Sequence, residues 1–433
     1  MTAEDPDRKV SSEQISDNVV LLVICLYAAS FVVFGFFVDS PEKIVQGLID
    51  IITTRDALLT DYFALGGMGA SFVNAGLLTL CASLVYYKSG TKMGGASVAC
   101  LFLVLGSALF GKNIMNVWFT VLGVFLYARF KNEAFATHIN TAFFGLALAP
   151  IFSEILFSTT IPISVRLPLS VCTSLVVGFV LAPAAAQLFK AHMGFNLYNM
   201  GFTAGIVGTL VVALYKSYGF VADPVFIWTT GNNLLLSGFL SVVFASMIGA
   251  GFYFDRTALL KLKELMRLSG QAPTDFVSQF GFGPTLANMG LAGAIGMAYV
   301  LLVGGDLNGP TIGAVFTIVG FAAFGKHPKN IVPIMVGVFV GSLAKPWNAG
   351  DPSIQLAALF GTTLAPIAGC FGWHWGIVAG FVHSSAALSV GSVHAGLNLY
   401  HNGFAAGIVA SVLVPVIMAI QSRTDRVSGD KDK

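Results

Sequence analysis

Charged residues are scarce in this sequence. Asp, Glu, Lys and Arg make up 10% of its 433 residues, whereas hydrophobic residues make up 56%. Soluble domains carry about 25% charged residues, so the composition excludes an ordinary soluble globular protein. The formal net charge is only +2, which excludes the strongly basic face that nucleic-acid binding requires.

Metal-binding, disulfide and catalytic motifs are lacking as well. The five cysteines stand in apolar segments without CxxC spacing, and this pattern suits neither a zinc site nor a disulfide framework. The sequence contains no HExxH, no GxSxG and no convergent Asp/His cluster. We therefore expect no metal, no cofactor and no enzymatic activity.

Apolar runs of about 20 residues are present along almost the whole chain, and each is long enough to cross a hydrocarbon core of roughly 30 Å. The first run, residues 19–38, is too long for the core of a signal peptide. Only residues 1–16 and 422–433 have the polar composition of tails, and we expect both to be cytoplasmic. The sequence thus predicts an all-α, polytopic membrane protein.

Four blocks of the first half return in the second half in unchanged order. They are Thr60-Asp61-Tyr62 with Thr274-Asp275-Phe276, Phe110-Gly111-Lys112 with Phe324-Gly325-Lys326, Leu148-Ala149-Pro150-Ile151 with Leu364-Ala365-Pro366-Ile367, and Asn196-Leu197-Tyr198 with Asn398-Leu399-Tyr400. Such self-similarity indicates an internal duplication. We place the first transmembrane repeat at residues 17–220 and the second at residues 221–421.

Each repeat holds seven apolar segments. Those of the first lie near 18–39, 61–87, 94–110, 114–130, 137–157, 167–189 and 196–215, and those of the second near 227–253, 275–303, 308–324, 328–344, 352–372, 375–393 and 398–420. If all of them cross the membrane, the chain has about 14 crossings. An odd number of crossings per repeat inserts the second repeat upside down, so we expect inverted topology.

The distribution of basic residues supports this topology. With the N-terminus in the cytoplasm, 17 of the 23 Lys and Arg residues fall on the cytoplasmic side, as the positive-inside rule requires. Both termini are then cytoplasmic. The segments 41–56 and 255–269 have apolar residues at helical spacing, so we expect each to lie along a membrane interface.

Closely spaced glycines predict discontinuous helices at matching places in the two repeats. Gly67 and Gly69 follow the first Thr-Asp pair, and Gly281 and Gly283 follow the second. Broken helices are tolerated at membrane depth where they line a cavity or meet protein partners. We expect the next polar residues, Asn74 and Asn288, to face a solute near the midplane. The alternative is that these glycines only permit close helix packing.

A Gly-Lys-x-x-x-Asn motif occurs once in each repeat. It places Lys112 with Asn116 in the first and Lys326 with Asn330 in the second. A lysine near hydrocarbon is costly and often functional, so we interpret both motifs as parts of a site for an anionic group. The alternative is a loop lysine that extends to the lipid headgroups.

A third matched motif, Asn-Leu-Tyr-x-x-Gly-Phe, contributes Asn196 and Tyr198, and then Asn398 and Tyr400. Amide and phenol groups donate and accept hydrogen bonds without carrying charge, so they suit recognition of a polar solute in a dry site. Hydrogen bonding between packed helices is the alternative. Glu154 has no acidic counterpart, and we consider it both as a coupling site and as a residue at the membrane boundary.

The blocks Phe324-Gly325-Lys326-His327-Pro328-Lys329-Asn330 and Asn398-Leu399-Tyr400-His401-Asn402-Gly403-Phe404 resemble an uncharacterised family of bacterial multi-pass membrane proteins, a domain of unknown function. The resemblance implies a location in the bacterial inner membrane and gives no substrate. In plan, the chain also resembles the inverted-repeat urea channels and the seven-plus-seven nucleobase and anion transporters. This second likeness is an analogy of architecture and carries no function by itself.

These observations favour a secondary transporter for a small polar or anionic solute that binds near the midplane between the two repeats. A passive channel for a small neutral solute such as urea is the alternative, and a membrane-embedded enzyme is less favoured. The partners we expect are the solute, membrane lipids and a coupling ion, Na⁺ or H⁺. A homo-oligomer is compatible with the sequence, whereas a nucleic-acid partner is not expected.

Overall fold

The structure is a computed structural model that describes residues 15–56, 59–220 and 226–429. The helices of the first half are α1 (Asp17–Val38), α2 (Pro41–Thr53), α3 (Tyr62–Leu65), α4 (Gly67–Ser89), α5 (Gly95–Ser107), α6 (Trp118–Phe130), α7 (Phe135–Phe144), η1 (Gly145–Leu148), α8 (Pro150–Leu156), α9 (Ile163–His192) and α10 (Asn199–Ser217). Those of the second half are α11 (Asn233–Phe254), α12 (Ala258–Leu265), α13 (Phe276–Phe280), α14 (Phe282–Leu302), α15 (Gly309–Phe321), α16 (Pro328–Ala344), α17 (Pro352–Gly361), η2 (Thr362–Leu364), α18 (Ala365–Phe371), α19 (Trp373–Val390), η3 (Gly391–His394) and α20 (His401–Gly429).

The strands of the described chain form one short sheet. β1 (Leu59–Thr60) pairs in parallel with β2 (Phe226–Ile227), with Leu59 opposite Phe226. The sheet joins a loop of the first half to the connection between the halves.

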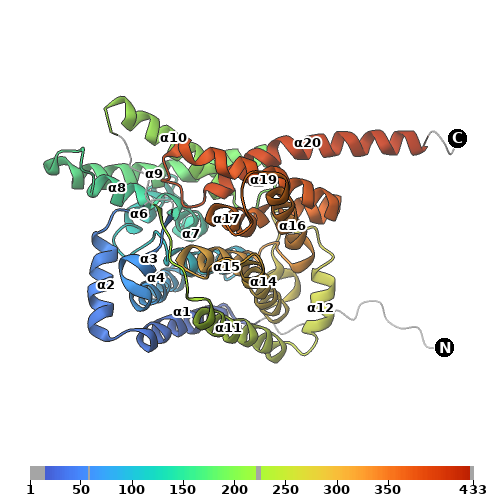
Figure 1. The fold of residues 1–433 in the computed structure, drawn as a ribbon, viewed down its shortest axis with the longest axis horizontal. Helices are drawn as coiled ribbons and strands as arrows, with labels where there is room; N and C mark the ends of the chain where they lie inside the picture. The colour runs from blue at the N-terminus through green and yellow to red at the C-terminus, as the bar shows by residue number, and fades with distance from the viewer. Residues whose placement is uncertain (1–14, 57–58, 221–225, 430–433) are drawn as a thin grey trace.

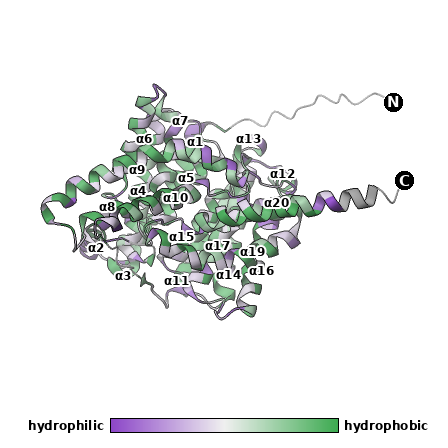
Figure 2. Ribbon diagram, turned by 90° about the horizontal axis from the view of Figure 1, so that it is seen from above, coloured by the Kyte–Doolittle hydropathy of each residue, from purple (hydrophilic) through white to green (hydrophobic). Residues whose placement is uncertain are grey.

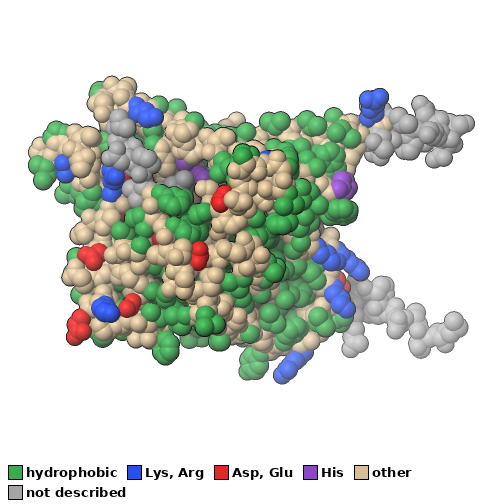
Figure 3. All heavy atoms as spheres, viewed as in Figure 1, with side chains coloured by type: hydrophobic (Ala, Val, Ile, Leu, Met, Phe, Trp, Pro, Cys, Tyr) green, Lys and Arg blue, Asp and Glu red, His purple; other side chains and the backbone are tan. Residues whose placement is uncertain are grey.

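Apolar helices confirm that this is a polytopic helical membrane protein. In the described part of the chain, nine helices are long and apolar enough to cross a membrane, or ten if the bent pair 135–148 and 150–156 is one span. Four shorter apolar helices are α5, α6, α15 and α16. Figure 3 shows hydrophobic side chains over much of one face, with Lys and Arg side chains near its left and right edges. The count of 14 crossings stays a prediction.

The two amphipathic segments form helices on opposite edges of the molecule. α2 lies at the left edge of Figure 1 and α12 at the right edge. In α12, Leu262 and Leu265 are buried whereas Lys263 is exposed, so one face of this helix packs and the other stays polar.

The last helix, α20, continues to Gly429, into the segment 422–433 that is expected to form the C-terminal tail. α20 is green over most of its length and becomes purple towards its C-terminal end (Figure 2). Its helical residues therefore extend beyond the apolar run that the sequence pattern marks.

Long helices pack in matched pairs within each half. α1 packs on α4, and α11 packs on α14. A Cβ atom on Gly69 would lie 2.8 Å from the carbonyl oxygen of Gly35, and one on Gly283 would lie 2.8 Å from that of Gly251. The absence of side chains at these glycines lets the helix backbones approach closely.

Three of the helix pairs that join the two halves consist of equivalent helices. α5 contacts α15 and α10 contacts α20, while α1 meets α11 through Phe34 and Phe239, whose ring centres are 4.1 Å apart. Tyr27 and Ser246 are hydrogen-bonded at 3.3 Å, so α1 and α11 run antiparallel. The centre of the molecule is therefore built from both halves.

Candidate functional site

The site contains two buried lysines, each bound to a tyrosine of the other half. The Lys112 ammonium donates to the Tyr400 hydroxyl, and the Lys326 ammonium donates to the Tyr198 hydroxyl. The ammonium nitrogens lie 4.6 and 4.4 Å from the centres of the same rings. Both lysine side chains are 0% exposed. The Gly-Lys-x-x-x-Asn motif of each half thus contacts the Asn-Leu-Tyr motif of the other half.

Among the described residues, the side-chain hydrogen-bond partners of the two lysine ammonium groups are hydroxyls. Lys326 has a second acceptor, the Thr362 hydroxyl at 2.8 Å. Among the ion pairs of the described residues, none includes Lys112 or Lys326. A buried charge is costly unless it is paired, so these two side chains are better suited to an anion than to a neutral partner.

Each lysine follows a glycine whose backbone takes a conformation that favours glycine. Gly111 has φ +147° and Gly325 has φ +122°. The Asn of each motif closes the turn: Asn116 donates to the Gly111 carbonyl at 3.2 Å, and Asn330 donates to the Gly325 carbonyl at 2.9 Å. Asn116 and Asn330 therefore shape the loops that carry the lysines.

Asn74 and Asn288 hold the same loops from the adjacent helices. Asn74 donates to the carbonyls of Ala108 and Lys112 at 2.7 and 2.9 Å. Asn288 donates to those of Ala322 and Lys326, both at 2.8 Å. Their amide donors serve the fold of their own half, and direct binding of a solute by these residues stays a prediction.

Asn196 and Asn398 position the tyrosines. Each accepts a hydrogen bond from the backbone N–H of the tyrosine two residues later, at 3.1 Å for Tyr198 and 3.0 Å for Tyr400. Each also donates across the halves: Asn196 to the Gly403 carbonyl at 2.9 Å and Asn398 to the Gly201 carbonyl at 3.1 Å. The third motif therefore fixes both tyrosines and fastens α10 to α20.

Two of the four glycines expected at helix breaks stand at helix boundaries, and the other two lie inside helices. α3 is separated from α4 at Gly66, and Gly67 has φ +85°, while the break between α13 and α14 is Gly281 with φ +88°. Gly69 and Gly283 lie inside α4 and α14. These two serve close helix packing, which was the alternative interpretation.

Two aspartates also act across the halves. Asp61 accepts from the backbone N–H of Gly309 at 3.2 Å, at the start of α15, and Asp275 accepts from that of Gly95 at 2.9 Å, at the start of α5. Carboxylates at a helix N-terminus satisfy free N–H groups and favour the helix dipole. Each half thus caps the short buried helix of the other.

A cavity of about 220 Å³ lies beside both tyrosines. Its lining includes Tyr198, Tyr400, Phe321 and Phe360. A smaller cavity of about 40 Å³ is lined by Leu399 and His401, the equivalents of Leu197 and Asn199 in the larger one. Phe360 lines both cavities, so the two cavities border the same side chain.

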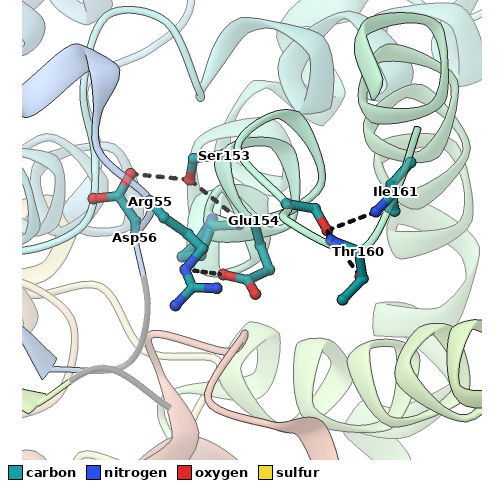
Figure 4. A network of polar contacts seen from close by, with 8 residues as sticks. Arg55, Asp56, Ser153, Glu154, Thr160 and Ile161 are labelled. Atoms are coloured by element: carbon teal, nitrogen blue, oxygen red, sulfur yellow. Dashed lines mark hydrogen bonds and ion pairs between the residues drawn. The ribbon is translucent and has the colours of Figure 1, made fainter. Parts of the chain in front are cut away.

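A second polar network occurs in the first half (Figure 4). Arg55 pairs with the buried Glu154 at 3.3 Å, so the charge of Glu154 is compensated. The buried Asp56 accepts from Tyr62, Asn116 and Ser153 at 2.7, 2.9 and 3.0 Å. Asp56 was not predicted as a site residue, because a single acidic residue in a loop has no distinguishing sequence pattern.

The fold and the apolar helices define a polytopic helical membrane protein. A family model described as "Protein of unknown function (DUF1576)" matches residues 40–217 and 254–419, and the chain belongs to this family. The resemblance to an uncharacterised family is thereby confirmed, whereas the bacterial origin stays a prediction. No curated protein and no solved structure matches the chain.

Proposed function

We propose that this protein is a secondary transporter of a small anionic solute, which binds near the midplane between two repeats of inverted topology. The observation that carries the proposal is the pair of buried lysines, each held by a tyrosine of the opposite half. A buried ammonium group favours an anion, because an anion compensates its charge where water cannot.

Inverted topology is supported by the direction and placement of equivalent helices. α1 and α11 run antiparallel, and the interfacial candidates α2 and α12 lie at opposite edges (Figure 1). The lysine–tyrosine contacts, the asparagine–glycine contacts and the aspartate caps across the halves each have an equivalent contact in the reverse direction. Such reciprocity is what a two-fold axis in the membrane plane generates.

Transport rather than passive flow is supported by the two unequal cavities. Equivalent residues line both, yet their volumes are about 220 and 40 Å³. In a transporter that exposes its site alternately, one vestibule is wide while the other is narrow. A channel needs a continuous path through both.

For the coupling ion, buried histidines favour H⁺ over Na⁺. His383 and His401 both contact the Asn402 amide, at 3.1 and 3.0 Å, and the His394 ring lies 6.2 Å from the His401 ring. Each imidazole ring can take up and release a proton at a ring nitrogen. Uptake driven by an inward proton gradient at equal sodium supports this choice, and uptake that requires a sodium gradient excludes it.

The test of the proposal is transport in proteoliposomes with single lysine substitutions. Lys112→Met and Lys326→Met keep most of the side-chain length and remove the charge. We expect affinity for an anionic solute to fall about 5- to 150-fold, the equivalent of roughly 1–3 kcal/mol for a lost charge-assisted hydrogen bond. Lys329→Met is the matched control, because Lys329 is exposed three residues after Lys326.

The same experiment separates the alternatives. A channel for a neutral solute such as urea predicts little change in flux in either lysine variant. Unchanged anion affinity in both variants, at equal protein density, would reject the proposal.

A further inference from the structure

Resting on the proposed function, we infer that the larger cavity receives a small organic monoanion with an apolar, preferably aromatic, body. The carboxylate lies at the wall that Tyr198 and Tyr400 form, and the body lies among the phenylalanines. The inference follows from the residues that line the cavity, from the hydrogen bonds that the polar lining groups already make within the protein, and from the cavity volume.

The lining of the cavity is mainly hydrophobic. Phe144, Phe189, Phe321, Phe324 and Phe360 all contribute to it. Aromatic side chains offer a large apolar contact area and favour edge-to-face contacts with another ring. A ligand without apolar surface gains nothing from these walls.

The amide groups of the lining are already engaged by the protein. Asn196 is bound to Gly403 and Tyr198, as described above, and Asn199 contacts His192 at 3.0 Å and the Ala185 carbonyl at 3.0 Å. Asn140 accepts from the Tyr86 hydroxyl at 2.6 Å. A sugar, a nucleobase or urea would therefore leave several of its polar groups unpaired, at a cost of roughly 1–3 kcal/mol for each.

The strongest polar feature of the cavity is the tyrosine wall. Both hydroxyls accept from a lysine ammonium, and each also has a second hydroxyl partner, Thr362 for Tyr198 and Ser107 for Tyr400. A carboxylate at this wall is therefore held mainly by the positive charge of the lysine behind each phenol. One anionic group per ligand matches this arrangement, since the remainder of the lining is mainly apolar.

The volume limits the size of the ligand. An apolar cavity of about 150 Å³ accommodates benzene, so the present cavity of about 220 Å³ accommodates one ring with a short acidic chain. Larger drug-sized ligands occupy pockets of about 300–1,000 Å³. 3-Phenylpropionate has the size and charge that the cavity favours.

The test is isothermal titration calorimetry on the full-length protein in lipid nanodiscs. 3-Phenylpropionate is compared with its neutral amide, 3-phenylpropionamide, and with two hydrophilic anions, succinate and sulfate. We expect the aromatic carboxylate to bind with the highest affinity and the amide to bind about 5- to 150-fold more weakly. Succinate and sulfate should not compete.

A substitution that fills the cavity tests its location. Ala185 of α9 lines the cavity and is buried, whereas the adjacent Ala186 is exposed. Ala185→Phe should weaken binding of 3-phenylpropionate by about tenfold or more, because the new ring occupies the space of the ligand's body. Ala186→Phe should leave the affinity unchanged, and equal unfolding temperatures of both variants confirm that the fold is kept.

The outcomes separate this inference from the proposed function. Lysine-dependent binding and transport of succinate or sulfate, with none of 3-phenylpropionate, would overturn the apolar-body inference and leave an anion transporter. Equal binding of the acid and the amide would overturn the assignment of the tyrosine wall. If none of the anions binds or is transported, the proposed function itself fails.

Discussion

The Lys326 ammonium lies 4.4 Å from the centre of the Tyr198 ring, and these residues belong to different halves of the chain. The equivalent contact, Lys112 with Tyr400, exchanges the roles of the halves. Neither half holds a complete site alone. The arrangement makes the two lysine environments similar but unequal, because Lys326 also binds the Thr362 hydroxyl.

Tyr400→Phe should destabilise the protein more than Tyr198→Phe does. Among described residues, the Lys112 ammonium has the Tyr400 hydroxyl as its only side-chain acceptor, whereas Lys326 keeps Thr362. A buried donor that loses its partner costs roughly 1–3 kcal/mol. Thermal unfolding of the purified variants in detergent measures the difference. Tyr253→Phe, at an exposed position, is the control, and equal loss in both variants would contradict the expected order.

Asp61→Ala and Asp275→Ala should each reduce stability by roughly 0.5–2 kcal/mol, the range for loss of a helix cap. Each carboxylate accepts from the first residue of a short buried helix of the other half. Asp61 also binds Thr229 in the connection between the halves, at 3.0 Å, so its loss should be larger. Chemical unfolding is the measurement, and Glu264→Ala at an exposed position in the last turn of α12 should have little effect. A similarly small effect of all three would argue against a role in joining the halves.

Gly106→Ala should destabilise the contact between α5 and α15. The added Cβ would lie 2.7 Å from the Gly313 carbonyl oxygen, and overpacking of this kind typically costs about 1–3 kcal/mol. Gly249→Ala is the matched control, since a Cβ there meets nothing within 4 Å. It should be neutral or stabilise the helix by about 0.5–1 kcal/mol. Thermal unfolding midpoints that shift alike in both variants would show that the close approach is unimportant.

Arg55→Met should destabilise the first half, and adding Glu154→Gln should restore part of the loss. Glu154 is 1% exposed and Arg55 is 23% exposed. Removal of one partner of a buried ion pair costs about 3–5 kcal/mol, largely because the other charge stays buried. A double-mutant cycle on unfolding free energies checks the coupling. If the losses of the two single variants simply add, the ion pair does not contribute.

Much of the fold was predictable because the pattern of apolar runs and the internal repeat are properties of the sequence itself. Comparison of the two sequence repeats identified Lys112 and Lys326 as one matched pair and Tyr198 and Tyr400 as another. The repeat did not predict that the lysine of one half contacts the tyrosine of the other, because that contact depends on how the two halves pack.

Glycines show a second limit. Gly67 and Gly69 have the same residue type and are two positions apart, yet one stands at a helix break and the other inside a packed helix. The two glycines differ in the residues around them, because Gly69 packs closely against α1. The lengths of α5 and α15 could not be predicted either, because their apolar runs continue into the non-helical loops that follow.

The reciprocal contacts set a condition on biosynthesis. Lys112 and Tyr400 are 288 residues apart, which at roughly 5–20 residues per second amounts to about 15–60 s of translation. During that interval the ribosome has delivered a lysine whose phenolic acceptor does not yet exist. The first half can therefore complete its lysine contact only after α20 has been synthesised.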